Sequence, residues 1–326
     1  MKLNLLKSAA IVLLFFAGFT MSLNAQTVND ALAAFNKGVE LSQVDNYDEA
    51  IASFKSAIEI LDQVEPENEN KIKAQEQILV VLYKKASTQL KGKKYTECLS
   101  SFQTLVEYST EYNNDKYLKR ANGAIPKVYY AQGKELLDAK KYDEALVSLN
   151  KSIELDPNYP TAYIRKAQVY DEINKDVEFK ETIDKAIDVA IQSNDNKSEE
   201  IAKQLAGNFF LRSAADAINA KKDEAAAQCF NNVLNYKEGD TDIYYQLAAI
   251  YNRLSKWDDA INAANKALEL FKEQGTTKDA RIYFELGNAF VGKQDNASAC
   301  DAFNKANKGD YAAQAKYQIE TVLKCQ

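Results

Sequence analysis

The chain has 326 residues, of which 46% are hydrophobic and 27% charged, as in an ordinary soluble globular protein. Its 11 glycines and 4 prolines are few, which excludes a β-sandwich or barrel with its frequent turns and favours helices. Because histidine is absent, Ser-His-Asp catalysis and His-ligated zinc are both excluded. The net charge of −6, with no basic stripe, argues against nucleic acid as a partner.

The N-terminus has the order of a secretory signal peptide. Lys2 and Lys7 both precede an apolar run over 9–19, and a polar stretch with small residues follows over 20–26. The run is about half of the ~20 residues that span a bilayer, so a retained transmembrane anchor is the weaker alternative. We expect a signal peptide over 1–25 and a mature chain over 26–326. Its style resembles Gram-negative signals, which predicts a periplasmic location, with an extracellular one as the alternative.

One pattern recurs along the rest of the chain. Segments 47–57, 142–152 and 257–267 each begin with an aromatic residue and carry small or apolar residues at i, i+4 and i+7 from an alanine. Twelve residues before that alanine lies another small residue, Gly38, Gly133 or Ala248, inside an earlier helical stretch. The pattern therefore predicts two helices that pack closely where the small residues meet.

This pattern resembles the tetratricopeptide repeat, W-x2-L-G-x2-Y followed by A-x3-F and P. The best copy reads Tyr244, Leu247, Ala248, Tyr251, Ala260, Ala264 and Ala267. The register gives repeats at 31–64, 79–112, 126–159, 160–193, 207–240, 241–274 and 280–313. In the fifth repeat, alignment on Ala226 is preferred over Ala225. The resemblance implies an all-α fold, a right-handed superhelical solenoid of helix-turn-helix repeats that bury one another's faces.

Four segments of the chain lie outside the repeats or at their end. Segments 65–78, 113–125 and 194–206 are polar and are either loops or extensions of first helices. The last segment, 311–326, has one apolar face and is predicted to be the capping helix that a repeat array needs.

The cysteines fall into two groups. Cys98 and Cys229 lie at small or apolar repeat positions and are expected in the core. Cys300 lies near the start of the last second helix and Cys325 ends the capping segment, so antiparallel stacking would bring them together. In an oxidising compartment this predicts a Cys300–Cys325 disulfide, with free thiols as the alternative.

No constellation of catalytic, cofactor-binding or metal-binding residues is found. Neither G-x-x-x-x-G-K-[ST] nor G-x-G-x-x-G occurs. Acidic pairs such as Asp48-Glu49 and Asp143-Glu144 recur at one repeat position, where they are expected to complement a helix N-terminus. We therefore expect no enzyme, no cofactor and no metal site.

The resemblance also implies where a partner would bind. In this family, first-helix residues one position after the aromatic, and four beyond it, line an inner groove. On that basis, with nearby polar residues that could donate hydrogen bonds, the groove candidates are Phe35, Tyr83, Tyr130, Lys134, Tyr245, Asn252, Arg253, Arg281, Phe284 and Asn288. The alternative is that tyrosine at this position only fills space. Phe35 and Val39 stand where cochaperones carry a carboxylate clamp, so that function is not implied.

The expected function is a non-enzymatic exported scaffold or adaptor. It would bind a protein or peptide partner through the concave face, in envelope assembly, secretion or signalling. The alternative is a self-associating structural protein of the envelope.

Overall fold

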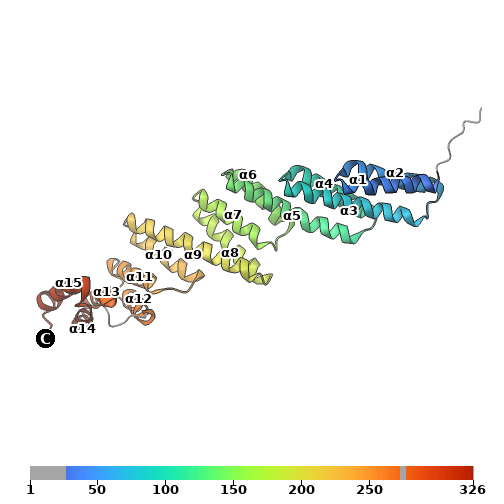
Figure 1. Ribbon diagram of the computed structural model, residues 1–326. Coiled ribbons are helices and arrows are strands. Elements are labelled where there is room, and N and C mark those ends of the chain that lie inside the picture. Colours follow the sequence, from blue (N-terminus) through green and yellow to red (C-terminus); the bar gives the residue numbers. More distant parts are fainter. Residues whose placement is uncertain (1–26, 272–276, 326) are drawn as a thin grey trace, which may run out of the picture. The chain divides into compact units, whose positions relative to one another are not determined.

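The computed structural model describes residues 27–271 and 277–325. The expected signal peptide, 1–25, lies outside the described residues. Within them the regular secondary structure is helical, with no strand, which confirms the predicted all-α class (Figure 1). Among these helices, none combines the length and apolar character needed to cross a membrane.

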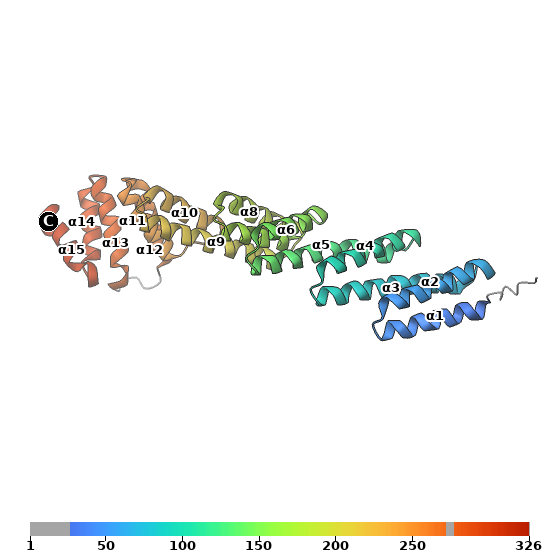
Figure 2. The ribbon, with the colours of Figure 1, turned by 90° about the horizontal axis from the view of Figure 1, so that it is seen from above.

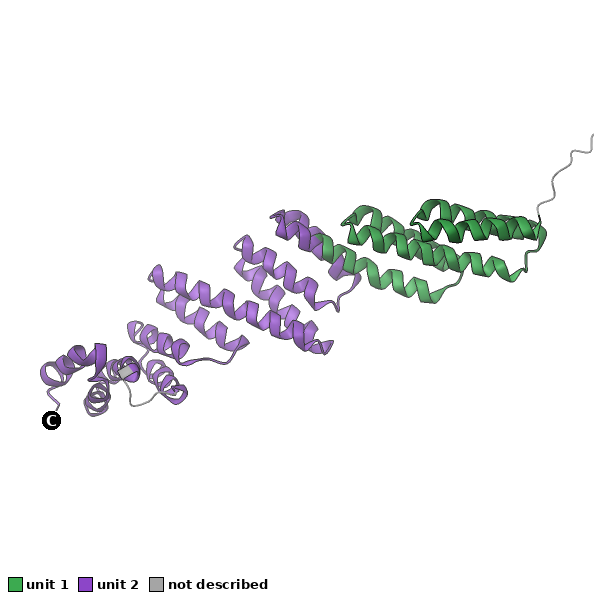
Figure 3. Ribbon diagram, in the orientation of Figure 1, with its two compact units in different colours: residues 1–132 green, residues 133–326 purple. Residues whose placement is uncertain are grey.

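The chain divides into two compact units at residues 132 and 133 (Figure 3). The first unit contains α1 (Val28–Gln43), α2 (Tyr47–Val64), α3 (Glu69–Lys91), α4 (Tyr95–Glu111) and the first part of α5 (Asp115–Asp138). The second unit contains the rest of α5, then α6 (Tyr142–Leu155), α7 (Pro160–Glu172), α8 (Asp176–Gln192), α9 (Asn196–Asn219), α10 (Asp223–Tyr236), α11 (Thr241–Arg253), α12 (Trp257–Leu270), η1 (Thr277–Asp279), α13 (Ala280–Gly292), α14 (Asn296–Ala306), η2 (Gly309–Tyr311), α15 (Ala312–Tyr317) and η3 (Gln318–Val322).

The turn inside each helix pair has the same backbone geometry. The second residue before each second helix has a positive φ of 55–62°. These residues are Asp45, Lys93, Lys140, Asn174, Lys221, Ser255 and Gln294. Since the left-handed region is disfavoured for any residue with a Cβ, its recurrence at one repeat position marks a turn that the packing of the two helices imposes.

The three polar segments between repeats are mainly helical. Helices α3, α5 and α9 begin at Glu69, Asp115 and Asn196, so all but the first residues of each segment extend a first helix. Of the two alternatives, extension is therefore the one that the structure adopts. The start of α9 is fixed by Asp195, whose Oδ1 accepts a hydrogen bond from the backbone N–H of Ser198 at 3.1 Å.

In each unit the core lies where the first helices of the repeats pack against the second helices. In the first unit the largest fully buried side chains include Phe54, Ile78, Leu79 and Leu105. In the second, the rings of Phe179 and Phe209 stack at 3.9 Å, and those of Phe210 and Tyr236 at 5.7 Å. Ala226 is fully buried while Ala225 is only partly buried, as the chosen register of the fifth repeat requires.

The last helix pair, α13 and α14, lies side by side in the second unit and is followed by the cap (Figure 2). We name residues 309–325 the cap. It is made of η2, α15 and the π-helical turn η3 rather than the single helix expected over 311–326. Ala315 of the cap is fully buried, and Ile319 and Leu323 pack around Phe303. The cap therefore covers the end of the last repeat, as a solenoid requires.

Candidate functional site on the second unit

The neighbouring first helices α11 and α13 are linked by a polar contact. The side-chain amide of Asn252 donates to the backbone carbonyl of Glu285 at 2.9 Å and to its Oε2 at 2.7 Å. The Asn288 amide donates to the same Oε2 at 3.4 Å. Both asparagines were predicted to hydrogen-bond a partner, and the structure instead directs their amide N–H groups to Glu285 within the unit.

Arg281 on α13 is held in place by two groups of α11. Its guanidinium lies 4.7 Å from the centre of the Tyr245 ring and forms an ion pair with Asp242. The hydroxyl groups of Tyr245 and Tyr311 are 3.2 Å apart, which brings the cap into the same cluster. Burial, followed by this hydrogen bond, raises the pKa of Tyr245, so its hydroxyl stays protonated at neutral pH.

Aromatic rings connect this cluster to the core of the last repeat. Phe284 lies 5.3 Å from Tyr311 and 5.5 Å from Phe303, measured between ring centres. Since Phe303 is fully buried, these edge-on and tilted ring contacts connect Tyr311 through Phe284 to the core.

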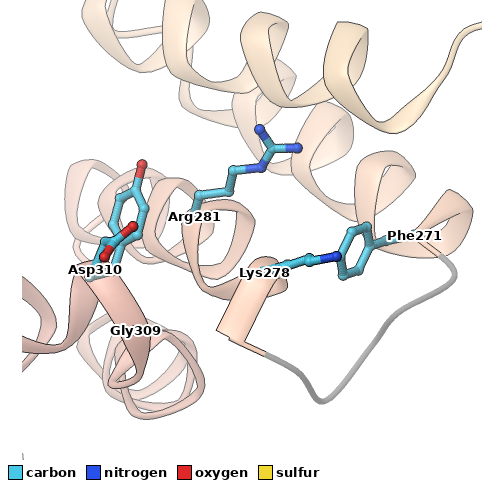
Figure 4. Close-up of a pocket in the computed structure, with 6 residues that line it drawn as sticks. Phe271, Lys278, Arg281, Gly309 and Asp310 are labelled. Carbon is cyan, nitrogen blue, oxygen red and sulfur yellow. The ribbon is translucent and has the colours of Figure 1, made fainter.

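A cleft of about 410 Å³ opens beside Arg281 (Figure 4). Its lining residues are Phe271, Lys278, Arg281, Gly309, Asp310 and Tyr311. The aromatic members can cover apolar groups, and the charged members are of both signs. Volumes of about 300–1,000 Å³ are typical of sites that enclose a small molecule or a few side chains.

A buried ion pair fixes the loop that leads into the cleft. Asp279, at the start of α13, is 1% exposed and its Oδ1 lies 2.6 Å from Nζ of Lys308. Lys308 directly precedes Gly309, so this contact anchors the cap side of the cleft to the α13 side.

Arg253 and Lys134 do not belong to this cleft. Nε and Nη2 of Arg253 donate to the Asp223 carboxylate of α10 at 2.7–3.0 Å, so these two nitrogen atoms are used within the unit. This pairing holds the pKa of Asp223 below its ordinary value. Lys134 is exposed, and its Nζ lies 3.8 Å from Asp138 on the same helix.

Two of the remaining predicted groove residues make aromatic contacts within the first unit. Phe35 packs edge-on against the buried Phe54 at 5.4 Å, and Tyr83 against Phe102 at 5.9 Å. Tyr130 is half-buried on α5. Phe35 fills space beside Phe54 and remains partly exposed.

Sequence reasoning missed several residues of the cleft. Phe271, Lys278, Asp310 and Tyr311 lie at the joins between the last repeats and the cap, outside the periodic positions. Tyr311 alone had a usable signal, because it is an aromatic residue at the start of a segment expected to dock on the last repeat.

The structure joins Cys300 of α14 to Cys325 at the end of the cap by a disulfide, with Cα atoms 5.8 Å apart. Cys98 is a buried free thiol and Cys229 a partly exposed one. The disulfide ties the far end of the cap to the helix that it covers. Tyr311 at the near end is thereby part of a doubly anchored segment.

Three segments of the chain match models of known protein families. Residues 31–60 and 240–307 match tetratricopeptide repeat models, and residues 127–173 match a TPR repeat model. The chain contains tetratricopeptide repeats. The match over 127–173 starts within α5, near the end of the first unit. The match over 240–307 covers α11 to α14 and ends before the cap residues that line the cleft.

The similar proteins are distant in sequence. A TPR repeat-containing protein of Methanocaldococcus jannaschii is 23% identical over 203 residues, which are 60% of this chain and 30% of that relative. This chain thus spans about 30% of the length of that relative.

Solved structures with similarity include YrrB, described as a TPR protein with an unusual peptide-binding site. It is 19% identical, with a TM-score of 0.33 and coverage of 58% of this chain and 90% of that one. The TPR2AB-domain:pHSP90 complex of yeast Sti1 is 16% identical, with a TM-score of 0.32 and coverage of 89% and 95%. A tetratricopeptide repeat protein from Parabacteroides merdae is 15% identical, with a TM-score of 0.28 and coverage of 88% and 96%.

Proposed function

We propose that the chain is a non-enzymatic scaffold that binds a peptide segment of a protein partner. The observation that carries this proposal is the cleft beside Arg281, where aromatic and charged side chains are held by contacts within the second unit. Tetratricopeptide repeats supply the rigid helix pairs on which such a site is built.

The cleft suits a peptide because its groups are fixed before binding. Tyr311 is held by Phe284 and Tyr245, and Arg281 by Tyr245 and Asp242. Binding a partner would therefore cost less conformational entropy, because these side chains of the cleft are already ordered. Tyr311 and Phe271 can pack on an apolar side chain of the peptide. Lys278 and Asp310 can pair with charged or polar residues next to that side chain.

The site of action is proposed to be outside the cytoplasm, in envelope assembly, secretion or signalling. The charged, apolar and small-residue order of 1–26 supports export. The Cys300–Cys325 disulfide supports the same location, since disulfides persist in oxidising compartments.

Photo-crosslinking in the cell tests this proposal. A photoreactive residue replaces Lys278 in the cleft, and in a matched control it replaces Lys266, which pairs with Glu269 on α12. We expect one dominant protein captured from position 278 and not from position 266. Equal capture from both positions would contradict binding in the cleft, and capture of a second copy of the chain would favour the self-associating alternative.

A further inference from the structure

A second cluster, in the first unit, places an arginine beside two tyrosine rings. The guanidinium of Arg120 lies 5.7 Å from the centre of the Tyr83 ring on α3 and 5.5 Å from that of Tyr117 on α5. The two rings are 6.5 Å apart. Tyr83 in turn packs on the buried Phe102, so the cradle is built on the core of the unit.

The guanidinium is exposed and its charge is not neutralised by a carboxylate. Arg120 forms no ion pair within the part of the chain that the structure describes. Arg120 is exposed, and a guanidinium carries a planar fork of N–H donors that matches a carboxylate. The two rings flank this unpaired cation at the surface.

Other cations surround this arginine. Residues 116–132 contain Lys116, Lys119, Arg120 and Lys127 and no acidic residue, although the whole chain is acidic. Lys116 lies 5.6 Å from the Tyr117 ring, and Lys127 lies two helical turns from Arg120 on the same face of α5. Lys85 on α3 is not counted, since it pairs with Asp48.

We propose that this cluster, Tyr83, Lys116, Tyr117, Arg120 and Lys127, binds an acidic segment of a protein partner. Arg120 would accept a Glu or Asp carboxylate in its fork, and the two lysines would attract flanking carboxylates. The exposed parts of the two tyrosine rings would contact apolar residues between them. This surface lies in the first unit and does not use the cleft beside Arg281, so either proposal can fail without the other.

Charge complementarity favours an acidic peptide over nucleic acid. Single strands also stack on aromatic rings and pair with arginine, but their binding depends on many cations along a phosphate chain. Here the three cations of the cluster stand in a chain of net charge −6, which repels a long polyanion and still accommodates a short acidic segment.

The test measures binding of a short fluorescein-labelled peptide of alternating Glu and Leu to the full chain, by anisotropy. Arg120→Gln should weaken binding by about tenfold or more, because a charged hydrogen-bonding partner is lost. Arg120→Lys should restore only part of it, since lysine keeps the charge without the fork. Lys55→Gln is the matched control: Lys55 also lies over a tyrosine, 4.8 Å from the Tyr108 ring, but between second helices α2 and α4.

Several outcomes would overturn the proposal. They are absence of binding to the unaltered chain, equal binding of a peptide with Gln in place of Glu, unchanged binding by Arg120→Gln, and an equal loss in Lys55→Gln. Tighter binding of a thymidine oligonucleotide than of the acidic peptide would also reject it and assign the cluster to single-stranded nucleic acid. Circular dichroism of each variant, compared with the unaltered chain, separates a lost contact from a lost fold.

Discussion

A Cβ atom placed on Gly287 would lie only 2.7 Å from Cε1 of Phe303, closer than two carbon atoms can pack. The same relationship joins Gly38 to Phe54 in the first unit, at 2.8 Å. In both repeats the absent side chain of the first helix makes room for the ring of the second helix. The close approach predicted from Gly38 therefore has a direct steric cause, and Gly287 shows the same cause in the last repeat.

Gly287→Ala is expected to destabilise the last repeat by about 1–3 kcal/mol, because overpacking forces either the ring or a helix to move. Phe303 is fully buried, so its ring has no empty space to enter. Urea unfolding followed by circular dichroism, with hydrogen exchange to locate the change in α13 and α14, measures the loss.

Gly207→Ala provides the control within the same unit. A Cβ at this α9 position would meet nothing nearer than Cδ of Lys237, at 3.5 Å, which is ordinary contact. Alanine should then stabilise the helix by up to about 1 kcal/mol through its higher helix propensity. Destabilisation of similar size in both variants would show that the ring contact is not the cause of the effect at Gly287.

Most of the fold could be predicted from the sequence because repetition averages over weak local signals. A single Tyr-Asp-Glu-Ala segment such as 142–145 is a poor predictor, but its recurrence fixes both the helix pairs and their register. The outcome at segments 65–78, 113–125 and 194–206 could not be predicted in the same way. Those residues follow no repeat register, and their polar composition suits a solvated helix as well as a loop.

The candidate sites were predicted less well, for a physical reason. Periodicity assigns a residue to a face of a helix, but it does not predict which neighbouring residue will form hydrogen bonds with its side chain. Asn252 was predicted to lie on a first helix, and it does. Its amide, however, donates hydrogen bonds to Glu285, a residue of the next repeat. Tyr311 lies where the last repeat joins the cap, and Arg120 lies in the segment 113–125 between repeats, so neither contact could be predicted from the repeat pattern.

Loss of the Cys300–Cys325 disulfide should loosen the cap. The bond closes a loop with a sequence separation of 25, for which chain entropy gives a stabilisation of about 3–4 kcal/mol. Cys300→Ser with Cys325→Ser should therefore raise hydrogen exchange in residues 312–322 and, through Tyr311, around Tyr245. Cys229→Ser, which removes a thiol that is not bonded, should leave exchange in the cap unchanged. Equal protection in all variants would show that apolar packing alone holds the cap.

The two free thiols should differ in reactivity. Burial raises the pKa of Cys98 to about 11, and the side chain is fully buried. At pH 8 only about one Cys98 thiol in a thousand would be ionised, and the thiolate is the reactive form. N-ethylmaleimide followed by mass spectrometry should therefore label Cys229 first and Cys98 only in denaturant. Rapid labelling of Cys98 in the native chain would contradict its burial between α3 and α4.

The ion pair between Asp223 and Arg253 should stabilise the α10–α11 contact in a pH-dependent way. The hydrogen bond from Arg253 lowers the pKa of Asp223 below its ordinary value of 3.8. The native state then binds fewer protons than the unfolded state, so this stabilisation is complete above 3.8 and is lost as the pH falls through the lowered native pKa. Since both side chains are partly exposed, the coupling should be under about 1 kcal/mol.

Urea unfolding of the double-mutant cycle of Asp223→Asn and Arg253→Gln measures this coupling energy. The coupling energy should be constant between pH 7 and 5 and should shrink below about pH 4, as protonation removes the carboxylate charge. A coupling that is unchanged at pH 3 would mean that the two side chains interact through packing rather than through charge.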